Sequence, residues 1–171
     1  MKYGIAIFPS KHIQDEANAL RKRYDPRYDL IPPHITLKSA FTADDSLRDE
    51  MIKELRKIAK ETKPFKIHMN KVRTFAPVTN TIFFKVEPIP ELTELHELMH
   101  TGIFPKEKEY NFVPHITIAQ ELVEDEFSDV LGTLSMKKIE FEDTVDRFQL
   151  CYQLENGSWT VYETFIFGSD D

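Results

Sequence analysis

The four-residue sequence Pro-His-Ile-Thr occurs twice in this chain of 171 residues, first at residues 33–36 and again at residues 114–117. Against the chain's own composition, a second copy is expected by chance in roughly 2 of 1,000 such sequences. The proline before each histidine favours an extended backbone, which suits a β-strand. The recurrence indicates that one structural element is used twice.

Each copy separates a polar face from an apolar one. Side chains alternate across a strand, so His34 and Thr36 point to one side and their apolar neighbours to the other. His115 and Thr117 are separated from their neighbours in the same way. We expect the apolar faces to enter the core, which leaves an imidazole beside a hydroxyl on each of two strands.

The predicted elements around the two copies follow one order: strand, proline, helix, Pro-His-Ile-Thr strand, helix, strand. Pro9 precedes His34 by 25 residues, and Pro88 precedes His115 by 27 residues. These similar intervals favour an internal repeat over a coincidence of short motifs. Two copies are too few for a solenoid.

The repeat predicts halves at about residues 1–76 and 80–153, followed by a C-terminal hairpin that reaches residue 168. The fold class is then α+β, with two pseudo-symmetric lobes around a central cleft. Each lobe is an antiparallel sheet with helices outside. Residues 1–171 are expected to form a single bilobal domain.

Three local patterns add detail to this outline. Thr42 followed by Asp45 resembles a capping box at the start of a long helix. An apolar stripe over residues 92–103 predicts a helix in the second half. The dipeptide Asn156-Gly157 between alternating apolar residues predicts a tight hairpin.

Composition limits the partners and the compartment. A net charge of −7 argues against an extended nucleic-acid surface, which needs a basic face, but allows a small anionic substrate in a local pocket. Cys151 is the only cysteine, so an intramolecular disulfide is excluded. No apolar stretch has the length of a signal peptide or membrane span, so we expect a cytoplasmic protein with no membrane partner.

Two histidines that face one cleft suit general acid–base catalysis, because imidazole titrates near neutral pH. Two threonine hydroxyls beside them can donate hydrogen bonds to the non-bridging oxygens of a phosphate. A phosphodiester fits this set of groups. One histidine deprotonates water and the other protonates the leaving oxygen, and no metal or other cofactor is needed.

The motifs His-Ile-Thr-Leu at residues 34–37 and His-Ile-Thr-Ile at residues 115–118 resemble the duplicated His-x-Thr-x motifs of the 2H phosphoesterase superfamily. That superfamily includes cyclic phosphodiesterases and bacterial 2′-5′ RNA ligase-like enzymes, and the likeness is strongest to its bacterial YjcG-like branch. The resemblance covers most of the chain. It implies a metal-independent phosphoesterase that acts on a cyclic phosphate or a 2′-5′ phosphodiester of a nucleotide or RNA end.

By this resemblance His34 is the proton donor, His115 is the proton acceptor, and Thr36 and Thr117 bind the phosphate. The residues themselves leave donor and acceptor interchangeable. They also leave open RNA ligation, which is the same chemistry in reverse, and a nucleotide- or phosphate-binding module without turnover. The expected partner is a small phosphorylated substrate, and nothing in the sequence indicates the oligomeric state.

Lys38 is a further candidate ligand for phosphate. It follows Thr36 by two positions, so an uninterrupted strand places it on the face of His34 and Thr36. Among the aromatic residues, Tyr3, Phe75 and Phe84 are candidates for stacking on a base, but packing in the core is favoured for each.

Residues 96–100 match the H-E-x-x-H signature of zinc proteases and provide a rival hypothesis. His96 and His100 lie one helical turn apart, as a zinc site requires. They flank the apolar stripe of a helix, however, and no third ligand is evident at a typical spacing. A zinc hydrolase is therefore the less favoured alternative, and two surface histidines on an amphipathic helix are expected.

Overall fold

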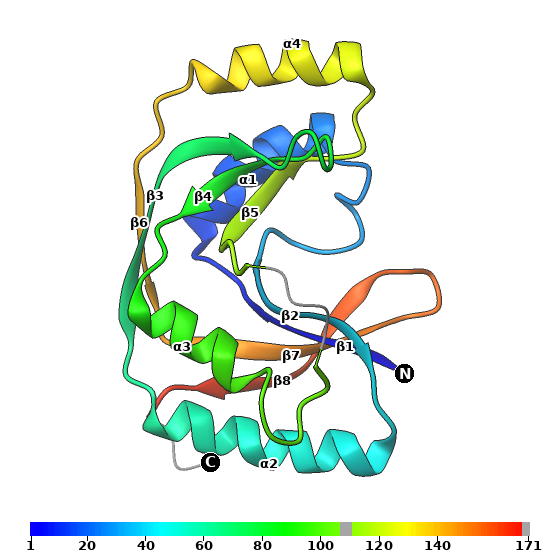
Figure 1. Cartoon of the computed structure of the whole chain (residues 1–171), viewed down its shortest axis with the longest axis vertical. Coiled ribbons are helices and arrows are strands. Elements are labelled where there is room, and N and C mark those ends of the chain that lie inside the picture. The colour runs from blue at the N-terminus through cyan, green and yellow to red at the C-terminus, as the bar shows by residue number, and fades with distance from the viewer. Residues whose placement is uncertain (107–110, 169–171) are drawn as a thin grey trace.

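The computed structural model describes residues 1–106 and 111–168, which form two four-stranded sheets and four helices (Figure 1). The helices are α1 (Lys11–Tyr24), α2 (Asp45–Glu61), α3 (Pro90–Leu98) and α4 (Glu124–Ser135). The strands are β1 (Lys2–Ile7), β2 (Ile35–Thr42), β3 (Phe65–Thr74), β4 (Ile82–Val86), β5 (His115–Ala119), β6 (Phe141–Val145), β7 (Arg147–Gln153) and β8 (Trp159–Ile166).

Sheet A has the strand order β2-β1-β7-β8, and sheet B has the order β5-β4-β3-β6. Every neighbouring pair of strands is antiparallel. The first Pro-His-Ile-Thr sequence leads into β2 at the edge of sheet A, and the second leads into β5 at the edge of sheet B. This arrangement confirms the predicted α+β class with two matching antiparallel sheets.

The sheets do not coincide with the two halves of the sequence. Strand β3, from the first half, pairs with β4 and β6 in sheet B. Strands β7 and β8, from the end of the chain, complete sheet A beside β1. In position, β7 is therefore the counterpart of β3, and β8 is the counterpart of β6.

Two helices pack against the sheet to which they do not connect directly. Helix α1 joins β1 to β2 of sheet A but packs against β5 of sheet B, and α3 joins β4 to β5 but packs against β2. The buried side of α1 has the spacing of an amphipathic helix, with Ile13, Ala17 and Leu20. Helix α2 packs against β8 and α4 against β3, at opposite ends of the molecule (Figure 1).

Apolar residues from both sheets and all four helices form one continuous core in the part of the chain that is described. Because α1 and α3 reach across to the opposite sheet, this core fixes the two sheets relative to each other. No helix within the described ranges is long and apolar enough to cross a membrane.

Two of the predicted boundaries are wrong. The N-cap of α2 is Asp44 rather than Thr42, because the Asp44 carboxylate accepts a hydrogen bond from the Leu47 amide at 2.8 Å. The helix predicted over residues 92–103 is shorter, since α3 ends at Leu98.

The C-terminal hairpin is confirmed. Gly157 lies in the turn between β7 and β8 with a φ of +90°, a conformation that glycine adopts without steric cost. Immediately after the turn, the backbone amide of Trp159 donates to the carbonyl of Leu30 at 2.8 Å. The hairpin is thereby attached to the loop that precedes the first motif.

A β-bulge interrupts the first motif strand. Ala6 of β1 pairs with Thr36, whereas the adjacent Ile5 pairs with Lys38, so Leu37 has no partner in the ladder. As a result, Leu37 and Lys38 are consecutive in sequence and both buried. A bulge of this kind turns the residues that follow it to the other face of the strand.

The second motif strand has the same interruption at the same position. Phe83 of β4 pairs with Thr117, whereas the adjacent Ile82 pairs with Ala119, and Ile118 is skipped. Ile118 and Ala119 are again consecutive buried residues. The duplication therefore extends beyond the four-residue sequence to the irregularity that follows it.

Candidate active site

A cavity of about 330 Å³ lies beside the two motif strands. His34 and Thr36 of the first motif and Thr117 of the second form part of its wall. His115 does not line this cavity, but it lies on the same face of β5 as Thr117 and is near enough to His34 to lower the pKa of that ring. The structure thus brings both His/Thr pairs together from two different sheets.

Both imidazole rings are held in the same orientation by the backbone. Nδ1 of His34 lies 2.9 Å from the carbonyl oxygen of Pro32, and Nδ1 of His115 lies 2.6 Å from that of Val113. A carbonyl oxygen only accepts, so Nδ1 carries the proton in each ring. In the neutral form, Nε2 of each histidine is then the basic atom that remains for chemistry.

The cleft favours the neutral form of both rings. Burial lowers the pKa of His34 to about 4; the hydrogen bond to Pro32 opposes this change, and the nearby positive charge of Arg21 adds to it. Burial also lowers the pKa of His115, against the effect of its hydrogen bond to Val113. In the free protein at neutral pH, both Nε2 atoms are therefore acceptors.

The two histidines have different neighbours. The His115 ring lies edge-on to Phe75, with centroids 4.9 Å apart, and 5.0 Å from the ring of Phe83. Phe75 and Phe83 also contact each other at 4.3 Å. Around His34, the ring of Phe8 lies at 6.2 Å. Sheet B therefore encloses its histidine in aromatic side chains more tightly than sheet A does.

The floor of the cavity belongs to sheet A and consists of small residues. Gly4 and Ala6 of β1 and Cys151 of β7 line it, and Gly4 pairs with Cys151 in the sheet. Burial raises the pKa of the Cys151 thiol to about 12, so this residue is a poor nucleophile. Gln149 pairs with Ala6 in the sheet, and its buried Oε1 lacks a hydrogen-bond partner among the described residues, which suits contact with a water or ligand.

The predicted placement of Lys38 on the His/Thr face is wrong because of the bulge. Lys38 pairs with the core residue Ile5, and only 1% of it is exposed. Its Nζ donates to the carbonyl of Pro105 and lies 5.4 Å from the centroid of the Phe41 ring. Lys38 still contributes to the cavity wall.

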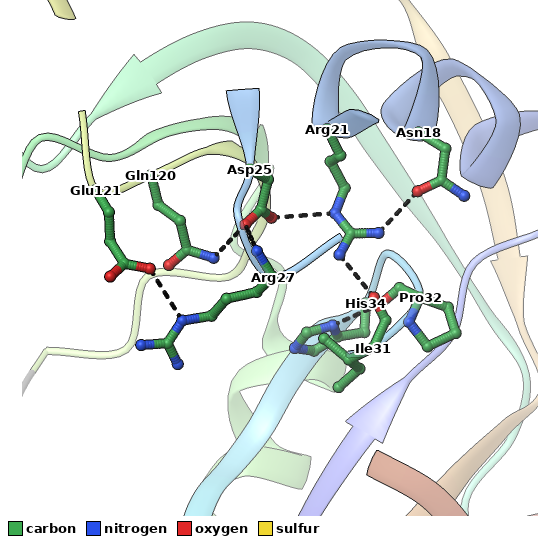
Figure 2. Close-up of polar contacts among 9 residues, drawn as sticks. All are labelled: Asn18, Arg21, Asp25, Arg27, Ile31, Pro32, His34, Gln120 and Glu121. Carbon is green, nitrogen blue, oxygen red and sulfur yellow. Dashed lines mark hydrogen bonds and ion pairs between the residues drawn. The ribbon is translucent and has the colours of Figure 1, made fainter. Parts of the chain in front are cut away.

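A buried ion pair forms part of the cavity wall, and Figure 2 shows its polar contacts. Arg21 and Asp25, only 2% and 6% exposed, are joined by an Nε–Oδ2 contact of 3.2 Å. The guanidinium also donates to Asn18 at 2.7 Å and to the carbonyl of Ile31 at 2.6 Å. The Asp25 carboxylate accepts a further hydrogen bond from the side chain of Gln120 at 2.9 Å.

This network connects the two motifs. Ile31 lies three positions before His34, and Gln120 is the residue immediately after β5. Chain segments that carry the two histidines are thus joined through one carboxylate and one guanidinium from the end of α1. At the cavity mouth, Arg27 makes a second and more exposed link to Glu121 at 3.1 Å.

Arg21, Asp25, Gln120 and Trp159 also line the cavity, and none was predicted as a site residue. One signal for Arg21 exists in the sequence: it lies four positions after Ala17, on the apolar side of α1 where a charge is unusual. For Gln120 and Trp159 no local pattern indicates a site, because tertiary packing brings them to the cavity.

The residues of the H-E-x-x-H pattern lie apart from the two His/Thr pairs. Helix α3 ends before His100, whose Nδ1 lies 2.6 Å from the carbonyl oxygen of His96. The His96 ring stacks on Phe112, with centroids 4.0 Å apart, and burial lowers its pKa to about 4. Within the described part of the chain, no group of three potential metal ligands forms at this or any other place.

Comparison with known proteins identifies the family. Residues 9–157 match the model of the 2′-5′ RNA ligase superfamily. The chain is 66% identical over 170 residues to "Putative phosphoesterase OB1230" of Oceanobacillus iheyensis, which covers 99% of this chain and 100% of that protein. A protein of Bacillus mycoides with the same functional name is 57% identical over 171 residues, which are 100% of this chain and 99% of the relative.

Solved structures share the fold at low sequence identity. The crystal structure of TT0787 of Thermus thermophilus has a TM-score of 0.73 and 17% identity, with both chains covered completely. The crystal structure of Escherichia coli LigT with 3′-AMP has a TM-score of 0.72 and 13% identity over 98% of each chain. Together with the family match, these likenesses confirm the resemblance seen in the two His-x-Thr-x motifs. The chain belongs to the 2′-5′ RNA ligase superfamily, the family of the 2H phosphoesterases.

Proposed function

We propose that this protein hydrolyses a cyclic phosphate or a 2′-5′ phosphodiester of a nucleotide or RNA end, using His34 and His115 as general acid and base without a metal ion. The observation that carries the proposal is the matched orientation of the two rings. In each, the proton on Nδ1 is directed to a backbone carbonyl, so both Nε2 atoms remain for proton transfer. The names of the relatives and the family match support phosphoester chemistry.

The reaction on a cyclic phosphate needs two proton transfers. One Nε2 takes a proton from a water molecule as the water oxygen bonds to phosphorus. The bond from phosphorus to the leaving oxygen breaks, and the other imidazolium donates its Nε2 proton to that oxygen. The product is a phosphomonoester with a free hydroxyl. Ligation of an RNA end is the same ring opening with a hydroxyl of the second strand in place of water, so the product is a phosphodiester instead of a phosphomonoester.

Threonine hydroxyls stabilise the charge that forms on phosphorus. Thr36 and Thr117 reach the cavity from opposite sheets and can donate to two different non-bridging oxygens. Crystal structures of E. coli LigT with 3′-AMP, NADP⁺ and ATP support a small nucleotide as ligand.

The family resemblance assigns the donor to His34 and the acceptor to His115. With a pKa of about 4, His34 is protonated in roughly one molecule in a thousand at pH 7 in the free protein. A bound phosphate carries negative charge within reach of the ring and raises this pKa, which restores the donor. Under this assignment, substrate binding itself charges the acid.

A substrate panel with single-histidine variants tests the proposal. The panel contains nucleoside 2′,3′-cyclic phosphates and short 2′-5′-linked oligonucleotides, assayed in EDTA. We expect turnover in EDTA and its loss in both His34→Ala and His115→Ala. His96→Ala is the matched control, because His96 belongs to neither His-x-Thr-x motif and its ring stacks on Phe112, and this variant should retain turnover.

An activated leaving group separates the two roles. A nucleoside 5′-(4-nitrophenyl) phosphate loses nitrophenolate, which needs no proton, so removing the acid should cost little on this ester. We expect His34→Ala to regain activity on it and His115→Ala to remain inactive. The reverse pattern exchanges the two assignments. Binding of cyclic phosphates without turnover of any substrate favours a binding module, and zinc-dependent turnover that His96→Ala abolishes favours a zinc hydrolase.

A further inference from the structure

The cavity is too large for a phosphate alone. Its 330 Å³ lies at the lower end of the roughly 300–1,000 Å³ typical of small-molecule sites, and one water occupies about 30 Å³ in the liquid. From His34 and Thr36 the cavity extends across sheet A to Trp159 at the start of β8. A ligand whose phosphate lies beside His34 and Thr36 therefore has room for an organic group toward Trp159.

Small residues keep this side open. A Cβ atom at Gly4 would lie 3.5 Å from Cζ3 and 3.7 Å from Cη2 of Trp159, so the indole lies over Gly4 at a distance that leaves room for no side chain larger than a methyl group. Ala6 and Cys151 continue the same surface toward the histidines. In sheet B, the residue that pairs with the motif threonine is Phe83 rather than an alanine.

The far end of the cavity combines an aromatic ring with an amide. The backbone amide of Trp159 is fixed to Leu30 at 2.8 Å, so the ring is positioned by two chain segments. Gln153 pairs with Trp159 across the hairpin, and its side-chain amide donates to Gly157 at 3.0 Å. The small residues Gly4, Ala6 and Cys151, together with one indole and the amide of Gln153, suit a heteroaromatic ring, which needs an aromatic partner and few polar ones.

We infer that the Gly4–Trp159 end of the cavity binds the base of a nucleotide, with Trp159 as its aromatic contact. The inference rests on the proposed function, because the His/Thr pairs place the phosphate. The ligand class is a nucleoside phosphate or nucleoside cyclic phosphate rather than a phosphosugar without a base.

Trp159 is the only tryptophan of the chain, so its fluorescence reports on this end of the cavity directly. The wild-type protein is titrated with inorganic phosphate, ribose 5-phosphate, adenosine 3′-monophosphate and uridine 3′-monophosphate, and calorimetry measures each affinity. We expect both nucleotides to change the emission of Trp159 and to bind more tightly than the two ligands without a base.

Variants separate the base contact from the phosphate contact. Trp159→Leu should weaken nucleotide binding by about 5- to 150-fold, the usual range for loss of one base–aromatic contact, and leave phosphate binding unchanged. Gly4→Val should produce a similar selective loss, because its methyl groups displace the indole that lies over residue 4, with the fluorophore still present. Tyr162→Leu is the matched control, since this ring lies on β8 but contacts Tyr3 on the other face of the sheet.

Two results overturn the inference. If nucleotides bind without changing Trp159 emission, and both cavity variants keep wild-type nucleotide affinity, the base lies elsewhere while the proposed function stands. If wild-type protein binds neither phosphate nor nucleotide and turns over none of the substrate panel, the proposed function fails together with the inference. Circular dichroism confirms that each variant is folded.

Discussion

The same motif lies on both sides of the cleft, but the residues beside it differ between the two sides. On each side, a buried proline precedes a half-buried histidine and threonine, and the same bulge follows. Beside the motif, however, Ala6 stands opposite Thr36 in sheet A, and Phe83 stands opposite Thr117 in sheet B. The sheet A side of the cleft is therefore open, and the sheet B side is filled by an aromatic ring.

This difference separates two requirements of a catalytic site. Under the proposed function, proton transfer and phosphate binding need the same geometry from each half, and the backbone hydrogen bonds orient both histidines alike. Recognition of the rest of a ligand needs room on one side and a firm wall on the other. Two matching motif strands with different neighbouring side chains meet both requirements.

The largest expected effect tests the equivalence of the two motifs. His34→Ala and His115→Ala should each slow hydrolysis of a nucleoside cyclic phosphate by about 10²–10⁴-fold, because each removes one proton transfer. The double variant should be little slower than either single variant, since the two groups act as a unit. Steady-state kinetics measures the rates. If one histidine can be removed without loss of rate, the two motifs do not contribute equally to the reaction.

The next effect tests the filled side. Phe83 is 2% exposed, so Phe83→Ala should lower the free energy of unfolding by about 3–5 kcal/mol. Trp159→Ala should cost less, because this half-buried ring borders the open cavity. Urea unfolding measures both, with Phe83→Leu as a milder variant if the alanine variant does not fold. Equal losses for Phe83 and Trp159 would remove the contrast between the two sides.

A smaller effect tests the threonines. Thr36→Val and Thr117→Val keep the shape of the side chain but remove the hydroxyl, and each should cost about 1–3 kcal/mol of transition-state stabilisation. The reduction in kcat should be similar in the two variants, with fold unchanged by circular dichroism. Should only one of them matter, the phosphate is held from one half of the cleft.

The pH dependence tests the shared burial of the histidines. Both pKa values are lowered from 6.5, so the bell-shaped profile of kcat/KM should have its maximum below pH 6.5. Activity falls with rising pH as the acid loses its proton, and it falls with decreasing pH as the base gains one. NMR titration of the two imidazoles gives the pKa values independently. An optimum above pH 7 contradicts this expectation.

Features with a local pattern could be predicted from the sequence, and features made by tertiary packing could not. The motif strands, the α+β class and the hairpin at Gly157 follow from alternation, order and turn chemistry. The orientation of Lys38 was predicted wrongly because the alternation of side chains between two faces assumes an unbroken strand. In the sequence, the only sign of the bulge is a pair of consecutive apolar or long side chains. Contacts such as Asp25 with Gln120 join residues 95 positions apart, and no local pattern encodes them.

The exchange of α1 and α3 between the sheets has a consequence for the origin of such a chain. A lone strand–helix–strand unit would leave the apolar side of its helix uncovered, since that side fits the other unit's sheet. Two copies of one ancestor would cover both helices by swapping them, as domain-swapped dimers do. The two motif histidines, which we propose to be catalytic, would then lie about the dimer axis, with one from each subunit. Fusion of the two genes would free each copy to change alone, and an alanine facing one threonine with a phenylalanine facing the other is the kind of divergence that a homodimer cannot achieve.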